Sequence, residues 1–246
     1  MARAAPRGGH HRAAGRCRLA HPVPPVRRDP VIIGGGPAGC AAAITLARTG
    51  ARTGCVPMLL ERSVGPMDKV CGDFLSVDTI QRARALGVDP AGLGGAPIDR
   101  VRLIRGDQTA EAALPFPALG LSRRTLDAAL LRQAEAAGVR VRSGQSVRRL
   151  GRVDGGWIVQ ADSAISASAV FLATGKHDLR DSPRRHTQRD AIGMKMYFAL
   201  AAGPGRTLEG ATELTLFPGG YAGMQSVEDG KAVLCIAVQR AAFQTY

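Results

Sequence analysis

The glycine-rich stretch VIIGGGPAGC, residues 31–40, limits what this chain can fold into more than any other feature. Its first part, Val31–Ile33, reads as a short buried strand, and apolar residues recur at helical spacing from Pro37 onward. Between them stand three glycines in the spacing Gly-x-Gly-x-x-Gly: Gly34, Gly36 and Gly39. Proline suits the first turn of a helix, and Gly50 suits the C′ position at its end. The sequence therefore predicts a strand, a glycine turn and a helix in direct succession.

Each glycine of such a turn has its own physical task. The first permits the tight turn, the second lets the backbone approach a diphosphate, and the third lets helix and strand pack closely. The start of the helix then presents free N–H groups and the positive end of the helix dipole to the phosphates. We therefore expect a dinucleotide-binding turn, for which a flexible glycine loop is the alternative.

An acidic residue after the next strand supports the dinucleotide interpretation. Met58–Leu60 reads as a second short strand that starts at or just after Pro57, and Glu61 follows it, 22 residues beyond Gly39. An acid at about this distance accepts a hydrogen bond from an adenosine ribose hydroxyl. Because Glu61 would repel a 2′-phosphate, NADP is disfavoured at this site. The alternative is an ordinary surface glutamate.

The rest of the chain alternates between helical and strand patterns. Helices are expected over residues 74–87, with Ser76 as N-cap, and over residues 122–138, with Ser122 as N-cap. A hairpin is expected over residues 98–114, around a Gly-Asp turn. Further strands are expected within residues 139–147, 156–162, 163–175, 191–200, 212–218 and 231–239.

The order of these motifs resembles that of FAD-dependent oxidoreductases of the para-hydroxybenzoate hydroxylase fold, and most closely their geranylgeranyl reductase-like branch. The resemblance runs from about residue 29 to the end and is carried by DPVIIGGGPAGCAAAITLAR, LLER, DKVCGDFLS, GLSRRTLDAALLRQAEAAGV and VFLATGKHDLR. It implies an α/β fold, in which a Rossmann-like FAD/NAD(P)-binding domain carries an inserted antiparallel β substrate domain.

The resemblance also implies a division of the chain. Residues 1–28 would be a disordered basic leader, and residues 29–190 the FAD-binding domain, with residues 63–120 contributing partly to the substrate side. Residues 191–246 would begin the antiparallel substrate sheet. The family usually carries a second flavin motif, containing Gly-Asp, well beyond that sheet. The sequence stops before such a segment, so we expect a C-terminally truncated chain in which FAD binding and activity are both in question.

The resemblance assigns roles to individual residues. The diphosphate would lie against the glycine turn and the helix start: Gly34, Gly36, Pro37, Ala38 and Gly39. Glu61 would hold the ribose, Arg62 would lie beside the adenine, and Arg123 would reach the phosphates or the ribityl chain. The remaining assignments are a backbone contact to adenine at Val147, a turn near the cofactor at Thr174 and Gly175, and a loop near the isoalloxazine ring at Cys71, Gly72 and Asp73.

Several of these residues have simpler interpretations. Arg62 and Arg123 could be surface arginines, Val147 could be a core residue, and Cys71 could be an inert loop thiol. Asp73 is the nearest candidate for a general base, although a loop-capping aspartate is the more ordinary role. The segment FPGGYAGMQSVEDG either lines the substrate cavity or forms a structural hairpin; its cavity candidates are Pro218, Gly220, Tyr221 and Gly223.

Composition limits the remaining classes of function. The formal net charge is +13, and the first 30 residues alone hold seven arginines against one aspartate. Charge by itself is weak evidence for nucleic-acid binding, and no recognisable nucleic-acid module is present. Five cysteines, without metal-ligand spacing, predict free thiols in a reducing compartment, no metal site and a cytoplasmic location. The chain lacks a run of 18 uncharged apolar residues, so no spanning helix is expected.

These observations lead to one main functional hypothesis and several alternatives. The main hypothesis is an FAD-dependent reductase that transfers hydride from reduced flavin to an alkene, isoprenoid-like or other apolar small molecule, with NAD(P)H as a transient electron donor. A flavin-dependent monooxygenase and a truncated, non-catalytic dinucleotide-binding protein are the alternatives. A halogenase is less favoured, because Trp157 is the only tryptophan and the usual Trp-rich motif is missing. The oligomeric state and contact with a membrane surface are left open.

Overall fold

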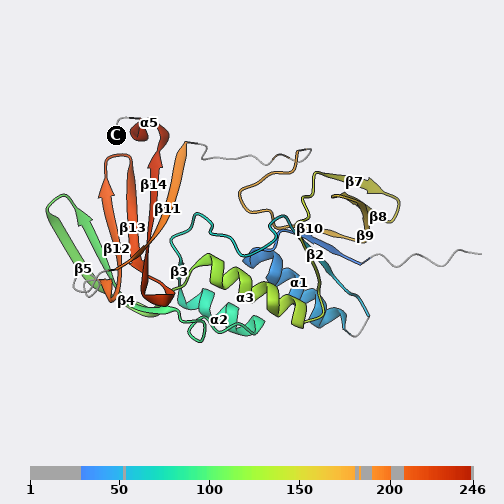
Figure 1. The fold of residues 1–246 in the computed structure, drawn as a ribbon, viewed down its shortest axis with the longest axis horizontal. Coiled ribbons are helices and arrows are strands. Elements are labelled where there is room, and N and C mark those ends of the chain that lie inside the picture. Colours follow the sequence, from blue (N-terminus) through green and yellow to red (C-terminus); the bar gives the residue numbers. More distant parts are fainter. Residues whose placement is uncertain (1–28, 52–53, 181–182, 184–189, 201–207, 245–246) are drawn as a thin grey trace, which may run out of the picture.

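The computed structural model describes residues 29–51, 54–180, 183, 190–200 and 208–244. The expected basic leader, residues 1–28, lies outside the described residues. Figure 1 shows an elongated molecule with three helices in its middle, a large sheet at one end and a small sheet at the other. No helix in the described part of the chain is long and apolar enough to cross a membrane.

A four-stranded parallel sheet lies in the middle of the molecule. Its strand order is β10-β1-β2-β6, formed by β10 (Val170–Leu172), β1 (Val31–Ile33), β2 (Met58–Glu61) and β6 (Arg140–Ser143). Helix α1 (Pro37–Gly50) follows β1 directly. The predicted strand, glycine turn and helix are therefore confirmed, as is the start of the second strand just after Pro57.

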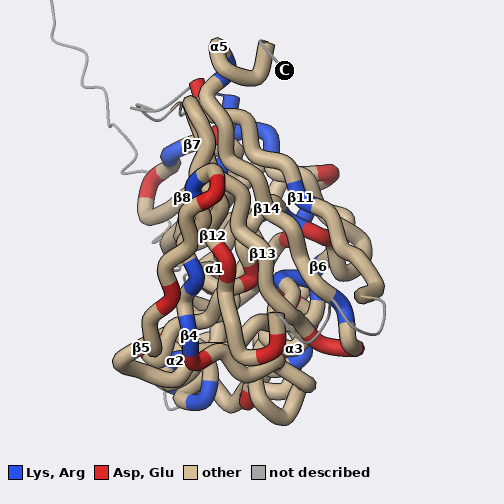
Figure 2. Tube along the Cα trace, turned by 90° about the vertical axis from the view of Figure 1, so that its left-hand side faces the viewer, with Lys and Arg blue, Asp and Glu red and all other residues tan. Residues whose placement is uncertain are grey.

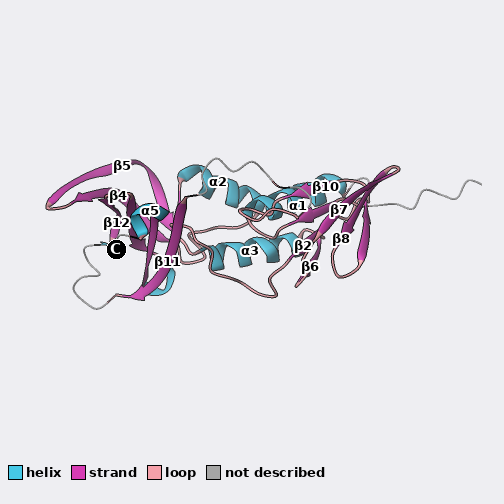
Figure 3. Ribbon diagram, turned by 90° about the horizontal axis from the view of Figure 1, so that it is seen from above, coloured by secondary structure: helices cyan, strands magenta, loops and turns pink. Residues whose placement is uncertain are grey.

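Both faces of the parallel sheet are covered, which explains why its two central strands are apolar over Val31–Ile33 and from Met58 to Leu60. Ile32 and Leu59 face a helical layer made of α1, α2 (Val77–Leu86) and α3 (Arg123–Ala136). Their neighbours in sequence, such as Ile33 and Leu60, face the small antiparallel sheet of β7 (Arg149–Val153), β8 (Gly156–Gln160) and β9 (Ala164–Ala167). Seen from above, the parallel sheet separates the helices from this small sheet (Figure 3).

The large sheet has seven strands in the order β11-β14-β13-β12-β4-β5-β3. Two distant parts of the sequence build it: β3 (Phe74–Leu75), β4 (Ala96–Arg105) and β5 (Gln108–Gly120) come from the first, and β11 (Ala191–Ala199), β12 (Gly210–Phe217), β13 (Gly220–Ser226) and β14 (Lys231–Gln239) from the second. All neighbours are antiparallel except β12 and β4, which are parallel. The α/β class with an additional, mainly antiparallel sheet is thereby confirmed.

Some local expectations were wrong. Phe74–Leu75 pairs with β5 as a strand, so the helix begins only after Ser76. The segment FPGGYAGMQSVEDG forms the hairpin that was one of its two interpretations, because β13 pairs with β12 as its antiparallel return strand. Gly50 is the last residue of α1 rather than its C′ residue, since Ala51 N–H still bonds to Ala47 C=O. The glycine is needed there because an added Cβ would lie 2.9 Å from Cys55 Cβ.

Candidate functional site

The βα turn between β1 and α1 leaves no room for a side chain at two of its glycines. Gly34 has φ +110°, and a Cβ added there would lie 2.4 Å from the carbonyl oxygen of Ala173. A Cβ added at Gly39 would lie 1.8 Å from the carbonyl oxygen of Gly34, so the helix packs on the turn with no room for a side chain. These two glycines set the backbone geometry of the turn.

Gly36 differs from these two, because it leaves space in front of the helix. It is the N-cap residue of α1, no side chain caps this helix start, and its first turn holds no acidic residue. The nearest atom to an added Cβ is Nη2 of Arg123, at 3.6 Å. The start of α1 therefore keeps free N–H groups and the positive end of the helix dipole next to a guanidinium, an arrangement that suits an anionic ligand.

Glu61 lies at the end of β2, next to this turn. Its Oε2 accepts a hydrogen bond of 2.6 Å from Gly35 N–H, and its Oε1 accepts one of 3.0 Å from Ser63 N–H. Burial alone would raise the pKa of Glu61, but the N–H groups of Gly35 and Ser63 lower it below the ordinary value of 4.5. A charged carboxylate is thus held beside the glycine turn.

The loop after β10 borders the turn on its other side. Thr174 Oγ1 donates a 2.5 Å bond to His177 C=O, and Gly175 turns the chain with φ +62°. Arg62, which follows Glu61, reaches across with Nη2 2.8 Å from His177 Nε2. The carboxyl ends of β2, β1 and β10 thereby bring together Glu61, Arg62, the glycine turn, Thr174 and Gly175.

Two predicted positions lie apart from this group. Val147 packs against the core cluster between the parallel sheet and the small sheet, which is the simpler of its two interpretations. Cys71 and Gly72 belong to the loop between β2 and β3; Cys71 is half-buried, and an added Cβ at Gly72 would meet nothing within 4 Å. Gly72 therefore leaves open space, as a position beside a planar ligand requires.

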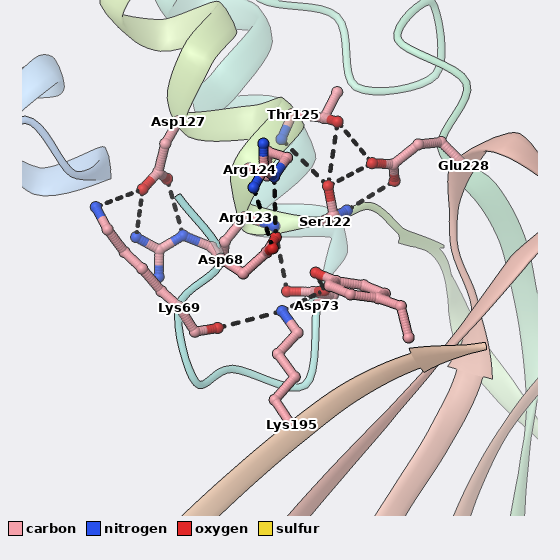
Figure 4. A network of polar contacts seen from close by, with 11 residues as sticks. Asp68, Lys69, Asp73, Ser122, Arg123, Arg124, Thr125, Asp127, Lys195 and Glu228 are labelled. Atoms are coloured by element: carbon pink, nitrogen blue, oxygen red, sulfur yellow. Dashed lines mark hydrogen bonds and ion pairs between the residues drawn. The ribbon is translucent and has the colours of Figure 1, made fainter. Parts of the chain in front are cut away.

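The start of α3, unlike that of α1, is closed by side chains (Figure 4). Ser122 Oγ accepts from Thr125 N–H, and Asp73 Oδ1 accepts from Arg123 N–H at 3.2 Å. Glu228, from the turn between β13 and β14, accepts from Ser122 N–H at 2.8 Å and from Thr125 Oγ1 at 2.6 Å. Burial acts to raise the pKa of Glu228, but its hydrogen bonds to Ser122 and Thr125 lower it overall.

Asp73 also connects the helical layer to the large sheet. Its Oδ2 accepts from Lys195 Nζ at 2.6 Å and from Tyr197 Oη at 2.7 Å, and the side chain of Asp73 is fully buried. Burial raises the pKa of Asp73, and hydrogen bonds from Lys195 and Tyr197 oppose this only in part. Because both oxygens already have donors, Asp73 is an anchoring carboxylate in this arrangement rather than a free base.

Arg123 points from the closed start of α3 towards the open start of α1. Its guanidinium makes a two-pronged pair with Asp127, with Nε–Oδ1 at 2.8 Å and Nη2–Oδ2 at 2.9 Å, and Lys69 Nζ lies 2.9 Å from the same Oδ2. Burial acts to lower the pKa of Arg123, but bonds to Asp127 and Cys71 raise it overall. The backbone oxygen of Lys69 accepts a further bond, 3.2 Å long, from Lys195 Nζ.

We call the face of the large sheet that carries Gly193, Lys195 and Tyr197 the inner face. Strand register places apolar and small residues beside these on the same face, in two rows: Cys235, Gly223, Leu214 and Leu103 next to Lys195, and Ala237, Tyr221 and Leu216 next to Gly193. An open hollow of about 390 Å³ lies between the loop of residues 68–70 and β11. Of the cavity candidates, Tyr221 and Gly223 lie on the inner face. Pro218 lies in the turn between β12 and β13, and Gly220 is the first residue of β13.

Sequence reasoning missed five residues of this site: Lys69, Asp127, Lys195, Tyr197 and Glu228. Asp127 gave a usable signal, because it stands four residues after Arg123 on the apolar stripe of its helix. Lys195 and Tyr197 alternate with Met194 and Met196, which marks one polar face of a strand. Nothing local singles out Glu228, whose partners are more than 100 residues away.

Comparison with protein-family models decides the affiliation. Residues 27–163, more than half of the chain, match the family described as FAD binding domain. This chain belongs to that FAD-binding family. FAD is thereby confirmed as its cofactor. The site fits this cofactor, because the open helix start at Gly36 can take a diphosphate and Glu61 can take a ribose hydroxyl.

Solved structures show the same fold at low sequence identity. A flavoprotein/dehydrogenase from Cytophaga hutchinsonii matches with TM-score 0.71 and 16% identity, over 89% of this chain and 57% of its own. The myxobacterial chondrochloren halogenase CndH matches with TM-score 0.72 and 20% identity, over 89% of this chain and 54% of its own. The protein pqsL, a probable FAD-dependent monooxygenase from Pseudomonas aeruginosa, matches with TM-score 0.68 and 16% identity, over 89% of this chain and 62% of its own. This FAD-binding chain thus spans less than two thirds of each of these structures. No curated protein matches its sequence.

Neither comparison points to the geranylgeranyl reductase-like branch in particular. The structural neighbours named here are a dehydrogenase, a halogenase and a probable monooxygenase. At these identities they establish the fold of the FAD-binding chain and leave its reaction to be argued from its own residues. Among the described residues, no group of three His, Cys, Asp or Glu side chains could hold a metal ion.

Proposed function

We propose that this chain is an FAD-dependent monooxygenase that acts on a small apolar molecule. The observation that carries the proposal is the pairing of an open, glycine-lined helix start with an inner sheet face of apolar and small residues. When bound and reduced, FAD supplies two electrons and activates molecular oxygen. The chain itself would bind the cofactor, orient the substrate and exclude water between the loop of residues 68–73 and β11.

Individual residues would hold the cofactor as follows. The N–H groups at the start of α1, at Ala38 and Gly39, would bind the diphosphate, together with the cations of Arg123 and Lys69. Glu61 would accept a hydrogen bond from the ribose. Arg62 would lie at the adenine end, and the Thr174–Gly175 turn would border the diphosphate.

The inner face supports an apolar substrate. A Cβ added at Gly223 would make ordinary van der Waals contact with Leu214 Cδ2 at 3.5 Å, so the backbone of β13 lies bare at this point of the inner face. Leu103, Leu216 and Tyr221 on the same face are 41%, 38% and 47% exposed, so large apolar side chains are available there to a ligand. Lys195, which also lies on this face, is already paired with Asp73.

The reductase hypothesis remains the second candidate. The sequence CGDFLS at residues 71–76 favours it through its resemblance to the geranylgeranyl reductase-like branch. A halogenase is disfavoured further by the position of Trp157, which stacks on Arg152 in the small sheet, against the far face of the parallel sheet. NAD(P)H remains the proposed electron donor for either candidate.

The cofactor site is tested by one glycine substitution. Gly36→Val should fold, because its Cβ meets only the flexible end of Arg123, but it should fill the space in front of α1. We expect FAD affinity to fall at least tenfold, about 1.4 kcal/mol, in a fluorescence titration. Gly151→Val is the matched control, since an added Cβ there meets only Ile158 Cβ at 4.0 Å in the small sheet. Equal FAD affinity in both variants would contradict the placement of the diphosphate.

The mass of the product distinguishes a monooxygenase reaction from a reductase reaction. The FAD-loaded protein is supplied with NADPH or NADH, oxygen and a panel of phenols and prenyl alcohols. A monooxygenase adds one oxygen atom to its product and consumes oxygen in step with it, whereas a reductase adds two hydrogen atoms and also works without oxygen. A product with two added hydrogens would replace the monooxygenase proposal with the reductase one.

A further inference from the structure

Asp127 is a buried carboxylate whose three close partners are all cationic nitrogens. It is 4% exposed, and its two oxygens receive Nε and Nη2 of Arg123 and Nζ of Lys69 at 2.8–2.9 Å. A carboxylate is buried at a high cost in free energy unless it is paired and hydrogen-bonded. The two-pronged geometry with Arg123 fixes the plane of the guanidinium as well as its position.

The cations that Asp127 holds come from two separate segments. Arg123 starts helix α3, and Lys69 belongs to the loop between β2 and β3. Asp127 and Lys69 line one small pocket together with Gly35 and Glu61, and Nη2 of Arg123 lies 3.6 Å from the Cβ position of Gly36. Figure 4 shows Lys69 and Arg123 converging on this one carboxylate. Both cations are therefore held beside the turn that faces the diphosphate.

We propose that Asp127 is a positioning residue, which holds Arg123 and Lys69 against the two phosphates of FAD before the cofactor arrives. The inference rests on the proposed cofactor site and adds a role that no motif in the sequence assigns. Free arginine and lysine side chains lose rotamer entropy when they are fixed. A carboxylate that fixes them beforehand removes part of this cost from binding.

A purely electrostatic role for Asp127 predicts the opposite result. The cluster has two positive charges and one negative charge, and Glu61 lies on the same pocket. If Asp127 only reduced the net positive charge of the cluster, Asp127→Asn would strengthen the binding of a diphosphate. If Asp127 positions the cations, the same substitution weakens it. The sign of the change in affinity therefore separates the two roles.

The experiment uses the full chain and three probes: FAD, ADP and adenosine. We expect Asp127→Asn to weaken FAD and ADP at least tenfold and to leave adenosine, which lacks phosphates, within twofold of the unsubstituted protein. Asp89→Asn is the matched control, because Asp89 also pairs with an arginine, Arg84, at 2.9 Å, but on an exposed surface at the end of α2. Unchanged or tighter FAD binding by Asp127→Asn overturns the inference, as does an equal loss for adenosine.

A second variant covers the case in which Asp127→Asn does not fold. Lys69 is 36% exposed, so Lys69→Met should be tolerated. The inference requires Lys69→Met to weaken FAD and ADP but not adenosine; unchanged FAD affinity overturns it. If the unsubstituted protein itself fails to bind FAD, the proposed cofactor site fails first, and this outcome is recognisable before any variant is compared.

Discussion

At the scale of single residues, two buried carboxylates have pKa values shifted in opposite directions. Glu61 lies beside backbone N–H groups, which lower its pKa despite burial, so it stays charged next to the glycine turn. Asp73 lies deeper, at 1% exposure and φ +57°, and burial raises its pKa even with Lys195 and Tyr197 attached. Glu61 lines a small pocket where a ligand can reach it, whereas Asp73 is enclosed by Arg123 N–H, Lys195 and Tyr197 and acts as an anchor.

The anchoring role of Asp73 gives a stability prediction. Asp73→Asn keeps a residue that tolerates positive φ but leaves Lys195 buried without its counter-charge, so the free energy of unfolding should fall by about 3 kcal/mol. Adding Lys195→Met should recover part of this loss, because the buried charge is then removed. Urea unfolding of the two single variants and the double variant checks this. Losses that simply add would show that the two side chains do not interact.

Sequence reasoning at this scale succeeded where the partners are close in the chain. The spacing from Gly34 to Glu61 is set by one helix and one strand, so a local pattern could place the acid beside the turn. Asp73 accepts from Arg123 N–H at the start of α3, but its charged partner Lys195 is 122 residues further on. No local pattern encodes which strand of a distant sheet will lie over a given loop.

At the scale of elements, the starts of α3 and α1 differ in whether side chains cap their N–H groups. Helix α3 begins with Ser122 as a side-chain cap and with carboxylates from Asp73 and Glu228, so the N–H groups of Ser122, Arg123 and Thr125 all have side-chain acceptors. Helix α1 begins without any of these and keeps its N–H groups available. Of the caps of α3, Ser122 was predictable because it is a local signal, whereas Glu228 was not, because it comes from a turn more than 100 residues further along the chain.

The Glu228 cap predicts a pH dependence. Its pKa is lower in the folded protein than its ordinary value of 4.5, so its contribution to stability is present above that value and is lost as the pH falls through the folded pKa. Glu228→Gln should therefore lower the free energy of unfolding by about 1–2 kcal/mol at pH 7 and by much less at pH 3. Denaturant titrations at both pH values check this. A difference between the two proteins that does not change with pH would contradict the charged cap.

At the scale of the whole molecule, the sequence predicted the layers but not the contacts between them. The apolar stretches at 31–33 and 58–60 predicted short strands, and the family resemblance implied a second, antiparallel sheet. How that sheet seats on the helical layer depends on long-range contacts such as the approach of Val70 to Gly193, where an added Cβ would lie 2.8 Å away. In the view of Figure 2, basic and acidic positions are interspersed along the chain rather than separated into single-sign regions.

Lys69 contacts both the nucleotide end of the site and the large sheet. Its ammonium holds Asp127 beside the glycine turn, and its backbone oxygen holds Lys195 on β11, above the hollow. We infer that binding at the nucleotide end and binding in the hollow are coupled through this residue, and such coupling acts equally in both directions. We expect an apolar compound that orders the hollow to tighten the binding of FAD, measured as a lower dissociation constant in a fluorescence titration. A molecule built this way would hold its cofactor most tightly when its substrate is present.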